Sequence, residues 1–237
     1  MLLYIIRHGV PDYTTDTLTE TGRAQAEAVV RRFQKLGLDK IFSSPMGRAR
    51  ETAEPTARAL GLPVEICPFM SEKVAGNHFY YNGADGKHHW AFFRRDLALG
   101  DPAFLSSRDS FSNGFYADDD LARRGFSELA AASDAFLAAL GYRKEGEANA
   151  YRVTEENELR VAAFCHGGFG LHWLSYLLAI PPHLLTCTFD FTHTGVTLLR
   201  FNDEGNGIAY PRLLQFSDLS HILAAELPYR FNDTIEV

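Results

Sequence analysis

Cysteine is scarce in this chain of 237 residues, and the few that occur follow no disulfide or metal spacing. The three are Cys67, Cys165 and Cys187, an odd number with no CxxC pair. Neither a disulfide framework nor a cysteine-based zinc site is indicated. We therefore expect a protein of a reducing, cytoplasmic compartment.

Net positive charge and long apolar runs are also missing. The formal net charge is -7, whereas a general binder of nucleic acid or anionic membranes needs a basic surface to release counterions. The longest later apolar stretch, about Leu171 to Ile180, is half the length of a bilayer-spanning helix. We expect no nucleic-acid partner, no membrane partner or span and no secretion signal, so any anion site must be cationic locally.

What the chain does have is an alternation of short apolar runs and amphipathic stretches in its first third. The runs predict strands and the stretches predict helices, the first helix beginning at an N-cap, Thr19, and ending at Gly37. Pro55 interrupts the second helix, where we expect a kink or two short helices. The predicted elements are a strand over 2–6, a helix over 19–36, a strand over 40–43, a helix over 46–60 and a strand over 64–66.

The regular alternation stops at about 73–120, which is rich in Gly, Asn, Asp and aromatic residues and reads as an insertion. It resumes afterwards, and Pro211 places the last run at a sheet edge. The later elements are a helix over 121–140, a strand over 159–165, a helix over 169–180 that Pro181 ends, and an antiparallel hairpin over 195–201 and 209–216.

This order of elements predicts an α/β fold: a three-layer α/β/α sandwich with a mostly parallel central sheet. We expect one domain over residues 1–237, with a large loop and helical insertion acting as a lid over the active site. Ligands of such sheets lie beyond the carboxyl ends of the strands. His8, Arg48 and His166 each follow a predicted strand closely, so all three are expected on one rim.

Several motifs occur in an order that carries more weight than any one of them. Arg7-His8-Gly9 follows the first strand, and Cys165-His166-Gly167-Gly168 follows a later one. Between them stand Leu18 to Ala26 at the first helix and Ser44-Pro45-Met46-Gly47-Arg48-Ala49 at the second. Over roughly residues 1–73 and 159–221, including Ser217-Asp218-Leu219-Ser220-His221, the chain resembles the histidine phosphatase superfamily, which includes phosphoglycerate mutases and many phosphomonoesterases.

That resemblance implies a metal-independent phosphatase that hydrolyses a phosphate monoester through a phosphohistidine on His8. Phosphoryl transfer needs an in-line nucleophile and fixed donors around three equatorial oxygens. Arg7 and Arg48 provide planar charged forks, and His166 provides a further donor. His8 attacks only when neutral; the neighbouring guanidinium groups should lower its pKa, and a backbone carbonyl should hold its other ring nitrogen.

Small residues complete the expected phosphate site. Gly9 and Gly167 allow backbone amides to approach an anion without a Cβ in the way, as does Gly168. Thr14 stands where the mutases of the family usually carry an asparagine, and we expect it to contact phosphate. No metal or cofactor is expected.

The leaving alkoxide needs a proton from a carboxylic acid whose pKa has been raised. Glu72, in Phe69-Met70-Ser71-Glu72, stands where the family usually places its glutamate and is the expected acid. Asp12, Glu65 and Asp85 are rivals. Lys73-Val74-Ala75 after Glu72 departs from the mutase pattern, and Val10-Pro11 replaces the acidic and small residues common after the Arg-His-Gly motif.

Other functions stay open on the sequence alone. A phosphoglycerate mutase-type phosphotransferase is the first alternative, and a non-catalytic module that binds a phospho-ligand is the second. The partners expected are a small-molecule phosphate ester and inorganic phosphate as product, while the oligomeric state is not predicted. The insertion also contains three histidines and an aspartate that could bind a metal, but their spacing matches no standard zinc pattern. We therefore interpret them as loop residues: His78, His88, His89 and Asp85.

Overall fold

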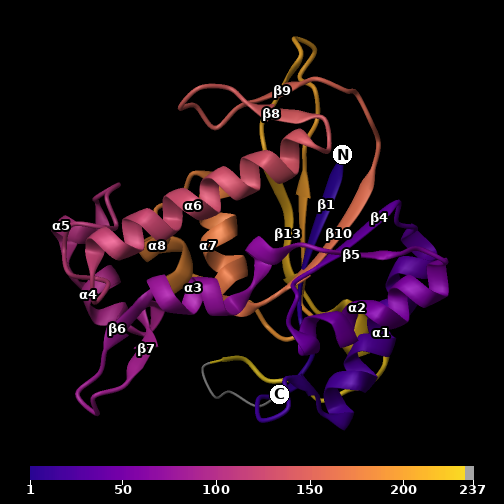
Figure 1. Cartoon of the computed structure of the whole chain (residues 1–237), viewed down its shortest axis with the longest axis horizontal. Coiled ribbons are helices and arrows are strands. Elements are labelled where there is room, and N and C mark those ends of the chain that lie inside the picture. Colours follow the sequence, from indigo (N-terminus) through magenta and orange to yellow (C-terminus); the bar gives the residue numbers. More distant parts are fainter. Residues whose placement is uncertain (233–237) are drawn as a thin grey trace.

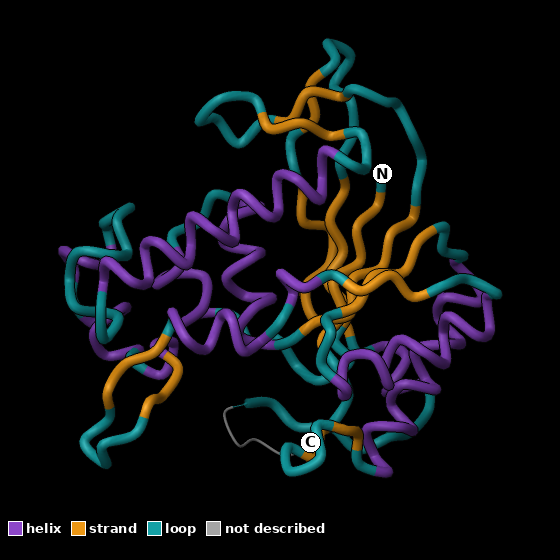
Figure 2. The backbone as a smooth tube through the Cα atoms, in the orientation of Figure 1, coloured by secondary structure: helices purple, strands orange, loops and turns teal. Residues whose placement is uncertain are grey.

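A six-stranded sheet forms the centre of the computed structural model, which describes residues 1–232 (Figures 1 and 2). The strand order is β13-β11-β1-β10-β4-β5. Four neighbouring strands are parallel: β1 (Leu2–Arg7), β10 (Arg160–Cys165), β4 (Lys40–Ser43) and β5 (Val64–Ile66). β11 (Val196–Arg200) runs antiparallel to β1, and β13 (Arg212–Asp218) runs antiparallel to β11. The mostly parallel sheet expected from the sequence is confirmed.

Side chains of β1 alternate between two hydrophobic cores, because successive strand residues point to opposite faces. Tyr4 and Ile6 pack with α1 (Glu20–Leu36) and α2 (Gly47–Leu60), while Leu3 and Ile5 belong to the core that contains α7 (Gly167–Leu178). Both faces of the sheet are therefore covered, and the predicted three-layer sandwich is confirmed. The remaining larger helices are α6 (Asp119–Ala138) and α8 (Pro182–Thr188) on the α7 side and α9 (Ser220–Ala224) beside α1.

The first two helices begin and end largely as the sequence predicts. The Thr19 hydroxyl accepts a hydrogen bond from the Gly22 amide at 3.0 Å, and Gly37 ends α1 with φ 74°. α2 is one helix with Pro55 inside it, so the expectation of two short helices is wrong. Proline deletes a single backbone hydrogen bond, and the buried face of Ala49, Ala53 and Ala57 holds the helix against the sheet.

The insertion is a set of short elements that packs on the main body. Phe79 stacks on His172 of α7 with ring centroids 3.9 Å apart, and Phe104 stacks on His183 of α8 at 4.0 Å. In Figure 1 it lies beside α6, α7 and α8, to one side of the sheet. Its elements, after η1 (Pro68–Met70), are α3 (Glu72–His78), β6 (Tyr80–Asn82), β7 (His88–Trp90), η2 (Ala91–Phe93), α4 (Arg95–Gly100) and α5 (Pro102–Leu105).

Two predicted boundaries near the end of the chain are wrong. The last strand begins only at Arg212, while Ile208–Ala209 forms β12, which pairs with β9 (Tyr151–Val153) and so joins β8 (Tyr142–Lys144) in a separate sheet. Strands this short carry too few alternating residues to be recognised. α7 begins at Gly167 rather than Phe169 because the two glycines form its first turn. Pro211 does precede an edge strand, as expected.

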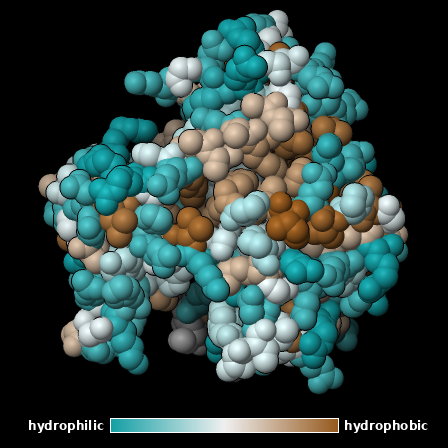
Figure 3. Space-filling model, viewed as in Figure 1, coloured by the Kyte–Doolittle hydropathy of each residue, from teal (hydrophilic) through white to brown (hydrophobic). Residues whose placement is uncertain are grey.

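Most of the surface in Figure 3 is hydrophilic, with apolar side chains gathered in a band across the middle of the face shown. Large apolar side chains exposed on the molecule include Ile66 of β5 and Val74 of α3. Within residues 1–232, none of the helices combines the length and the apolar character needed to cross a bilayer. A small hairpin of β2 (Pro11–Asp12) and β3 (Thr17–Leu18) precedes α1.

Candidate active site

The register of two parallel strands brings His8 and His166 together. Arg7, the last residue of β1, is the partner of Cys165, the last residue of β10, so the residues that follow leave the sheet at the same level. The two imidazole rings meet edge to face, with centroids 5.1 Å apart. Both side chains are buried. The convergence predicted at the carboxyl rim is confirmed for this pair.

A backbone carbonyl fixes which nitrogen of His8 carries the proton. His8 Nδ1 lies 2.7 Å from the Gly9 carbonyl oxygen, which can only accept, so Nδ1 holds the hydrogen and Nε2 holds the lone pair. Burial lowers the pKa of His8 well below its ordinary value, and Arg7, His166 and His193 lower it further. His8 is therefore a neutral imidazole with its lone pair on Nε2, which is the nucleophilic form.

Arg48 is held over that lone pair from the first turn of α2. Its Nε donates to His8 Nε2 at 3.2 Å, and its Nη1 forms an ion pair with Asp16. Asp16 also accepts from the Gly47 amide at 2.8 Å, and the exposed ring of Tyr13 lies 5.4 Å from the guanidinium carbon. Asp16 could not be identified from the sequence. It lies in a loop of polar residues, and no pattern there shows which carboxylate orients an arginine.

Arg7 is oriented by groups distant in the sequence. Its Nη1 donates to the Phe191 carbonyl at 2.6 Å and to Asn232 Oδ1 at 2.9 Å. Asn232 is itself held by Asp190, whose carboxylate accepts from the Asn232 amide at 2.8 Å. A Cβ added to Gly167 would lie 3.2 Å from the Arg7 guanidinium carbon, so glycine gives that side chain its space.

The second histidine is supported by a strand-end serine. His166 Nε2 lies 2.7 Å from the Ser44 hydroxyl, whereas His166 Nδ1 is buried and has no partner among the described residues. Burial lowers the pKa of His166 well below its ordinary value, and Arg48 and Arg7 act in the same direction. His166 is a neutral hydrogen-bonding group with one nitrogen to offer a ligand.

Glu72 reaches the same rim from the start of α3. Its two carboxylate oxygens accept from the amides of Gly168 at 3.0 Å and Phe169 at 2.8 Å, in the first turn of α7. Burial raises the pKa of Glu72, an effect that these amides and the charges of Arg7 and Arg48 oppose. A carboxyl group with a raised pKa beside two arginines has the character of a proton donor.

The rival carboxylates lie elsewhere on the surface. Glu65 is exposed on β5, and Asp85 is exposed and accepts a hydrogen bond from His89 Nε2 at 2.9 Å. Asp12 accepts from both the amide and the hydroxyl of Thr14, at 2.9 and 2.6 Å. None of these three has the burial that raises the pKa of Glu72.

The three small residues predicted to contact phosphate occupy different settings. Thr14 is exposed in the β2–β3 turn, and its hydroxyl donates to Asp12. The Gly9 amide donates to the Thr52 hydroxyl at 3.0 Å, and Gly9 packs so tightly that a Cβ would meet the Gly22 oxygen at 2.6 Å. Contact of Thr14, Gly9 and Gly167 with phosphate stays a prediction.

A third histidine lies at the centre of the site. The ring of His193 is 5.4 Å from that of His8, and its Nε2 is buried without a partner among residues 1–232. His193 precedes β11, the antiparallel neighbour of β1, and Val196 pairs with Ile6. The start of an antiparallel neighbour lies at the same rim as the ends of parallel strands. Since His193 comes shortly before a predicted strand, the same rule of sheet geometry could have placed it at this rim from the sequence.

The insertion histidines are placed in and near the β6–β7 hairpin. His88 stacks on Tyr80, His89 contacts Asp85, and His78 Nδ1 lies 2.7 Å from the Val74 carbonyl. In the part of the chain that the structure describes, no group of three or more His, Cys, Asp or Glu side chains is arranged to hold a metal ion.

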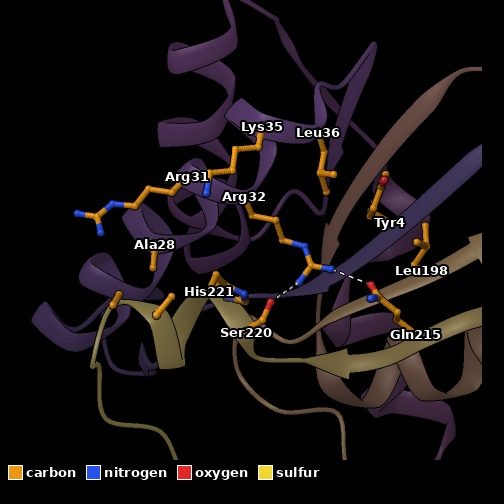
Figure 4. A pocket seen from close by; sticks show the side chains of 12 residues that line it. Tyr4, Ala28, Arg31, Arg32, Lys35, Leu36, Leu198, Gln215, Ser220 and His221 are labelled. Carbon is orange, nitrogen blue, oxygen red and sulfur yellow. Dashed lines mark hydrogen bonds between the residues drawn. The ribbon is translucent and has the colours of Figure 1, made fainter.

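A separate cavity of about 680 Å³ lies between α1 and the C-terminal strand (Figure 4). Arg32 spans it and donates to Gln215 at 2.8 Å and to Ser220 at 3.3 Å, while His221 lines one wall. None of the predicted site residues lines this cavity. The two ends of the Ser217–His221 motif therefore lie in different places. Ser217 contacts the loop of His193, whereas His221 faces this second cavity.

Two guanidinium groups, three neutral imidazoles and a carboxyl group with a raised pKa thus meet at one edge of a parallel sheet. Such a set of donors beside a neutral imidazole has the chemical character that binding of a phosphoryl group requires. Residues 3–91 match the family model of the histidine phosphatase superfamily (branch 1). This part of the chain is therefore similar to members of that superfamily.

Known proteins similar to this chain include both mutases and phosphatases. A probable phosphoglycerate mutase of Escherichia fergusonii is 34% identical over 83 residues, which cover 31% of this chain and 39% of the mutase. A putative phosphoserine phosphatase of Hydrogenobacter thermophilus is 31% identical over 98 residues, covering 38% and 45%. The alignments thus span about two fifths of these relatives.

Similarity of fold extends over nearly the whole chain. The structure of a mycobacterial glucosyl-3-phosphoglycerate phosphatase with inorganic phosphate has a TM-score of 0.60 and 23% identity. It covers 93% of this chain and 98% of that one. The match confirms the α/β fold of the chain, including the part beyond residue 91.

Proposed function

We propose that the chain is a metal-independent phosphatase that hydrolyses a small-molecule phosphate monoester through a phosphohistidine on His8. The observation that carries the proposal is the Nδ1–H of His8 on the Gly9 carbonyl, because it leaves the Nε2 lone pair directed into a cluster of cations. A structural histidine in a buried core has no need of two neighbouring guanidinium groups.

The first step forms the bond between His8 Nε2 and phosphorus and breaks the bond between phosphorus and the ester oxygen. Arg7, Arg48 and His166 donate to the three phosphoryl oxygens as charge spreads over them. Glu72 gives its proton to the leaving oxygen, so an alcohol departs and Glu72 becomes a carboxylate.

The second step returns the enzyme to its starting state. The Glu72 carboxylate takes a proton from a water molecule, whose oxygen attacks phosphorus as the bond to His8 Nε2 breaks. Inorganic phosphate leaves, His8 is again neutral with its hydrogen on Nδ1, and Glu72 is again protonated. No metal enters either step.

The insertion over residues 73–120 is proposed to form the wall that selects the alcohol part of the substrate, within one domain. Trp90 lies against Gly168, where a Cβ would meet the indole ring at 2.4 Å, and Gly168 donates to Glu72. The indole is thereby placed next to the residue that protonates the leaving group. Similarity to phosphatases among the relatives supports hydrolysis.

The test is release of phosphate from p-nitrophenyl phosphate and from a panel of alkyl phosphates, in the presence of EDTA. We expect turnover by the unaltered chain, none by His8→Ala, and normal turnover by the control His221→Ala, whose side chain lines the separate cavity beside α1. An acid-labile phosphate on His8, trapped by alkaline quenching and located by mass spectrometry, identifies the intermediate.

Two other outcomes would replace this proposal. Transfer between two hydroxyls of a phosphoglycerate, followed by phosphorus NMR with a bisphosphoglycerate primer, indicates a mutase, the activity assigned to the Escherichia fergusonii relative. Tight vanadate binding without hydrolysis of any ester indicates a binding module.

A further inference from the structure

Unpartnered buried nitrogens concentrate around His8. Among residues 1–232, seven buried side-chain nitrogen or oxygen atoms lack a hydrogen-bond partner. Three of them are Arg7 Nε, His166 Nδ1 and His193 Nε2, and they belong to the three side chains that lower the pKa of His8 by their charge. Buried polar atoms are normally satisfied, so three unsatisfied nitrogens in one place indicate a ligand that accepts hydrogen bonds there.

The loop that carries His193 is strained and tied to the nucleophile's own backbone. Thr194 has φ 54°, in the left-handed region that a β-branched residue seldom adopts. Its amide donates to the Arg7 carbonyl at 3.0 Å and lies 3.3 Å from the His8 carbonyl. Strain of this kind persists only where neighbouring contacts enforce it, and it concentrates at functional sites.

Further contacts hold the same loop from the other side. The Thr192 amide donates to the Ser217 hydroxyl at 2.9 Å, and the Gly195 amide donates to the Thr192 carbonyl at 2.9 Å. A Cβ on Gly195 would meet the Ser217 oxygen at 2.5 Å, so the turn closes only with glycine there. These contacts hold the backbone on both sides of His193 and so fix the position of its ring beside His8.

We propose that His193 is a further catalytic residue of this site, whose Nε2–H donates a hydrogen bond to the phosphoryl group while it is transferred to and from His8. The inference rests on the function proposed above. The ligand it recognises is a tetrahedral or trigonal-bipyramidal oxyanion, with His193 contacting an equatorial oxygen.

The charge state of the ring fits this role. Burial, followed by Arg7, Arg230 and Arg48, lowers the pKa of His193 to about 2, so the ring is neutral at physiological pH. A neutral donor adds a directional hydrogen bond without adding a third cation beside two guanidinium groups. Preorganised donors of this kind act mainly on the transition state, where the oxygens carry more charge.

Substitutions that move the donor along the side chain test the atom that matters. The amide nitrogen of glutamine can occupy the position of Nε2, whereas that of asparagine corresponds to Nδ1. We expect His193→Ala to lower kcat/KM for p-nitrophenyl phosphate about 100-fold. His193→Gln should recover most of that loss and His193→Asn little of it. His221→Gln is the matched control, because His221 is also buried without a partner among residues 1–232 but lines the separate cavity beside α1.

Equilibrium binding separates this inference from the proposed function. Vanadate mimics the transferring phosphoryl group, so His193→Ala should weaken the binding of vanadate about 100-fold and that of inorganic phosphate less, with recovery in His193→Gln.

Vanadate affinity within twofold of the unaltered chain in all three variants would overturn the role of His193, even if His8→Ala abolishes turnover. Loss and recovery of vanadate affinity in a chain that hydrolyses no ester would overturn the phosphatase and leave the donor in place. Absence of vanadate binding by the unaltered chain would overturn both.

Discussion

Arg48 Nε donates to His8 Nε2 across 3.2 Å, so a permanent cation is directed at the lone pair that we propose attacks phosphorus. The contact shows where that lone pair points. The same guanidinium group also pairs with Asp16, which holds it in this orientation. When a phosphoryl group enters between the two side chains, the same fork can turn its N–H groups to the oxygens.

Arg48→Lys should lower kcat/KM about 100-fold, because an ammonium cannot donate in a fixed planar fork to phosphoryl oxygens while pairing with Asp16. Steady-state kinetics with p-nitrophenyl phosphate measure the effect. Arg50→Lys is the control, since Arg50 is exposed on the same helix and pairs only with Glu54 at 3.9 Å. Equal activity of both variants would show that Arg48 has no part in binding phosphate.

Glu72→Gln should affect substrates in proportion to how much their leaving group needs a proton. Alkyl phosphates should lose about 100- to 10,000-fold in kcat, the range of general acid catalysis, whereas p-nitrophenyl phosphate should lose far less. Because the pKa of Glu72 is raised, alkyl phosphate hydrolysis should also fall as the pH rises through that pKa and the acid ionises, and the variant should lose that limb.

The same measurements on Glu65→Gln control for removal of a carboxylate, since Glu65 is exposed on β5. A uniform loss across all esters in Glu72→Gln would assign the acid role to another group. It would indicate that Glu72 only holds the first turn of α7 through the amides of Gly168 and Phe169.

The sequence predicts the catalytic rim well because a single rule of sheet geometry governs it. Residues that follow parallel strands meet at one edge, which is how His8, Arg48 and His166 could be placed together before any coordinates. The prediction that a carbonyl holds the other nitrogen of His8 is confirmed at Gly9. The prediction that neighbouring arginines lower the pKa of His8 is right in direction, with burial as the larger cause.

What the sequence could not predict depends on contacts between distant segments. Asp16 and Asn232 orient the two arginines from loops whose paths no periodicity reveals. His193 was missed because the rim argument was applied only to parallel strands. The insertion was recognised by its composition, yet its packing on α7 depends on the fit of Trp90 against Gly168.

Stability should fall as the solution is acidified, and His172 is the group that best tests the reason. Burial lowers the pKa of His172 to about 4 from its ordinary 6.5. Between these two pH values the residue is protonated in the unfolded chain and neutral in the native chain. Stability is therefore present above 6.5 and lost as the pH falls towards 4. Between pH 7 and pH 5 this residue alone should cost about 2 kcal/mol.

Urea unfolding at pH 5, 6 and 7 measures this dependence. His172→Phe keeps the stack on Phe79 but has no proton to gain, so its loss of stability over that interval should be about 2 kcal/mol smaller than that of the unaltered chain. An unchanged slope in the variant would mean that His172 is not held neutral by its surroundings.

Gly168→Ala tests whether the packing of the insertion against α7 fixes the surroundings of Glu72. The new Cβ would lie 2.4 Å from the Trp90 indole, so overpacking should reduce the free energy of unfolding by about 1–3 kcal/mol. Gly100→Ala is the matched control, because nothing lies within 4 Å of its Cβ and alanine favours the helix. Adding Trp90→Ala removes the clash, so the double variant should be more stable than the sum of the two single losses by about 1–3 kcal/mol. Strict additivity in this double-mutant cycle would mean that Trp90 moves aside freely, and the insertion would then not fix the surroundings of Glu72.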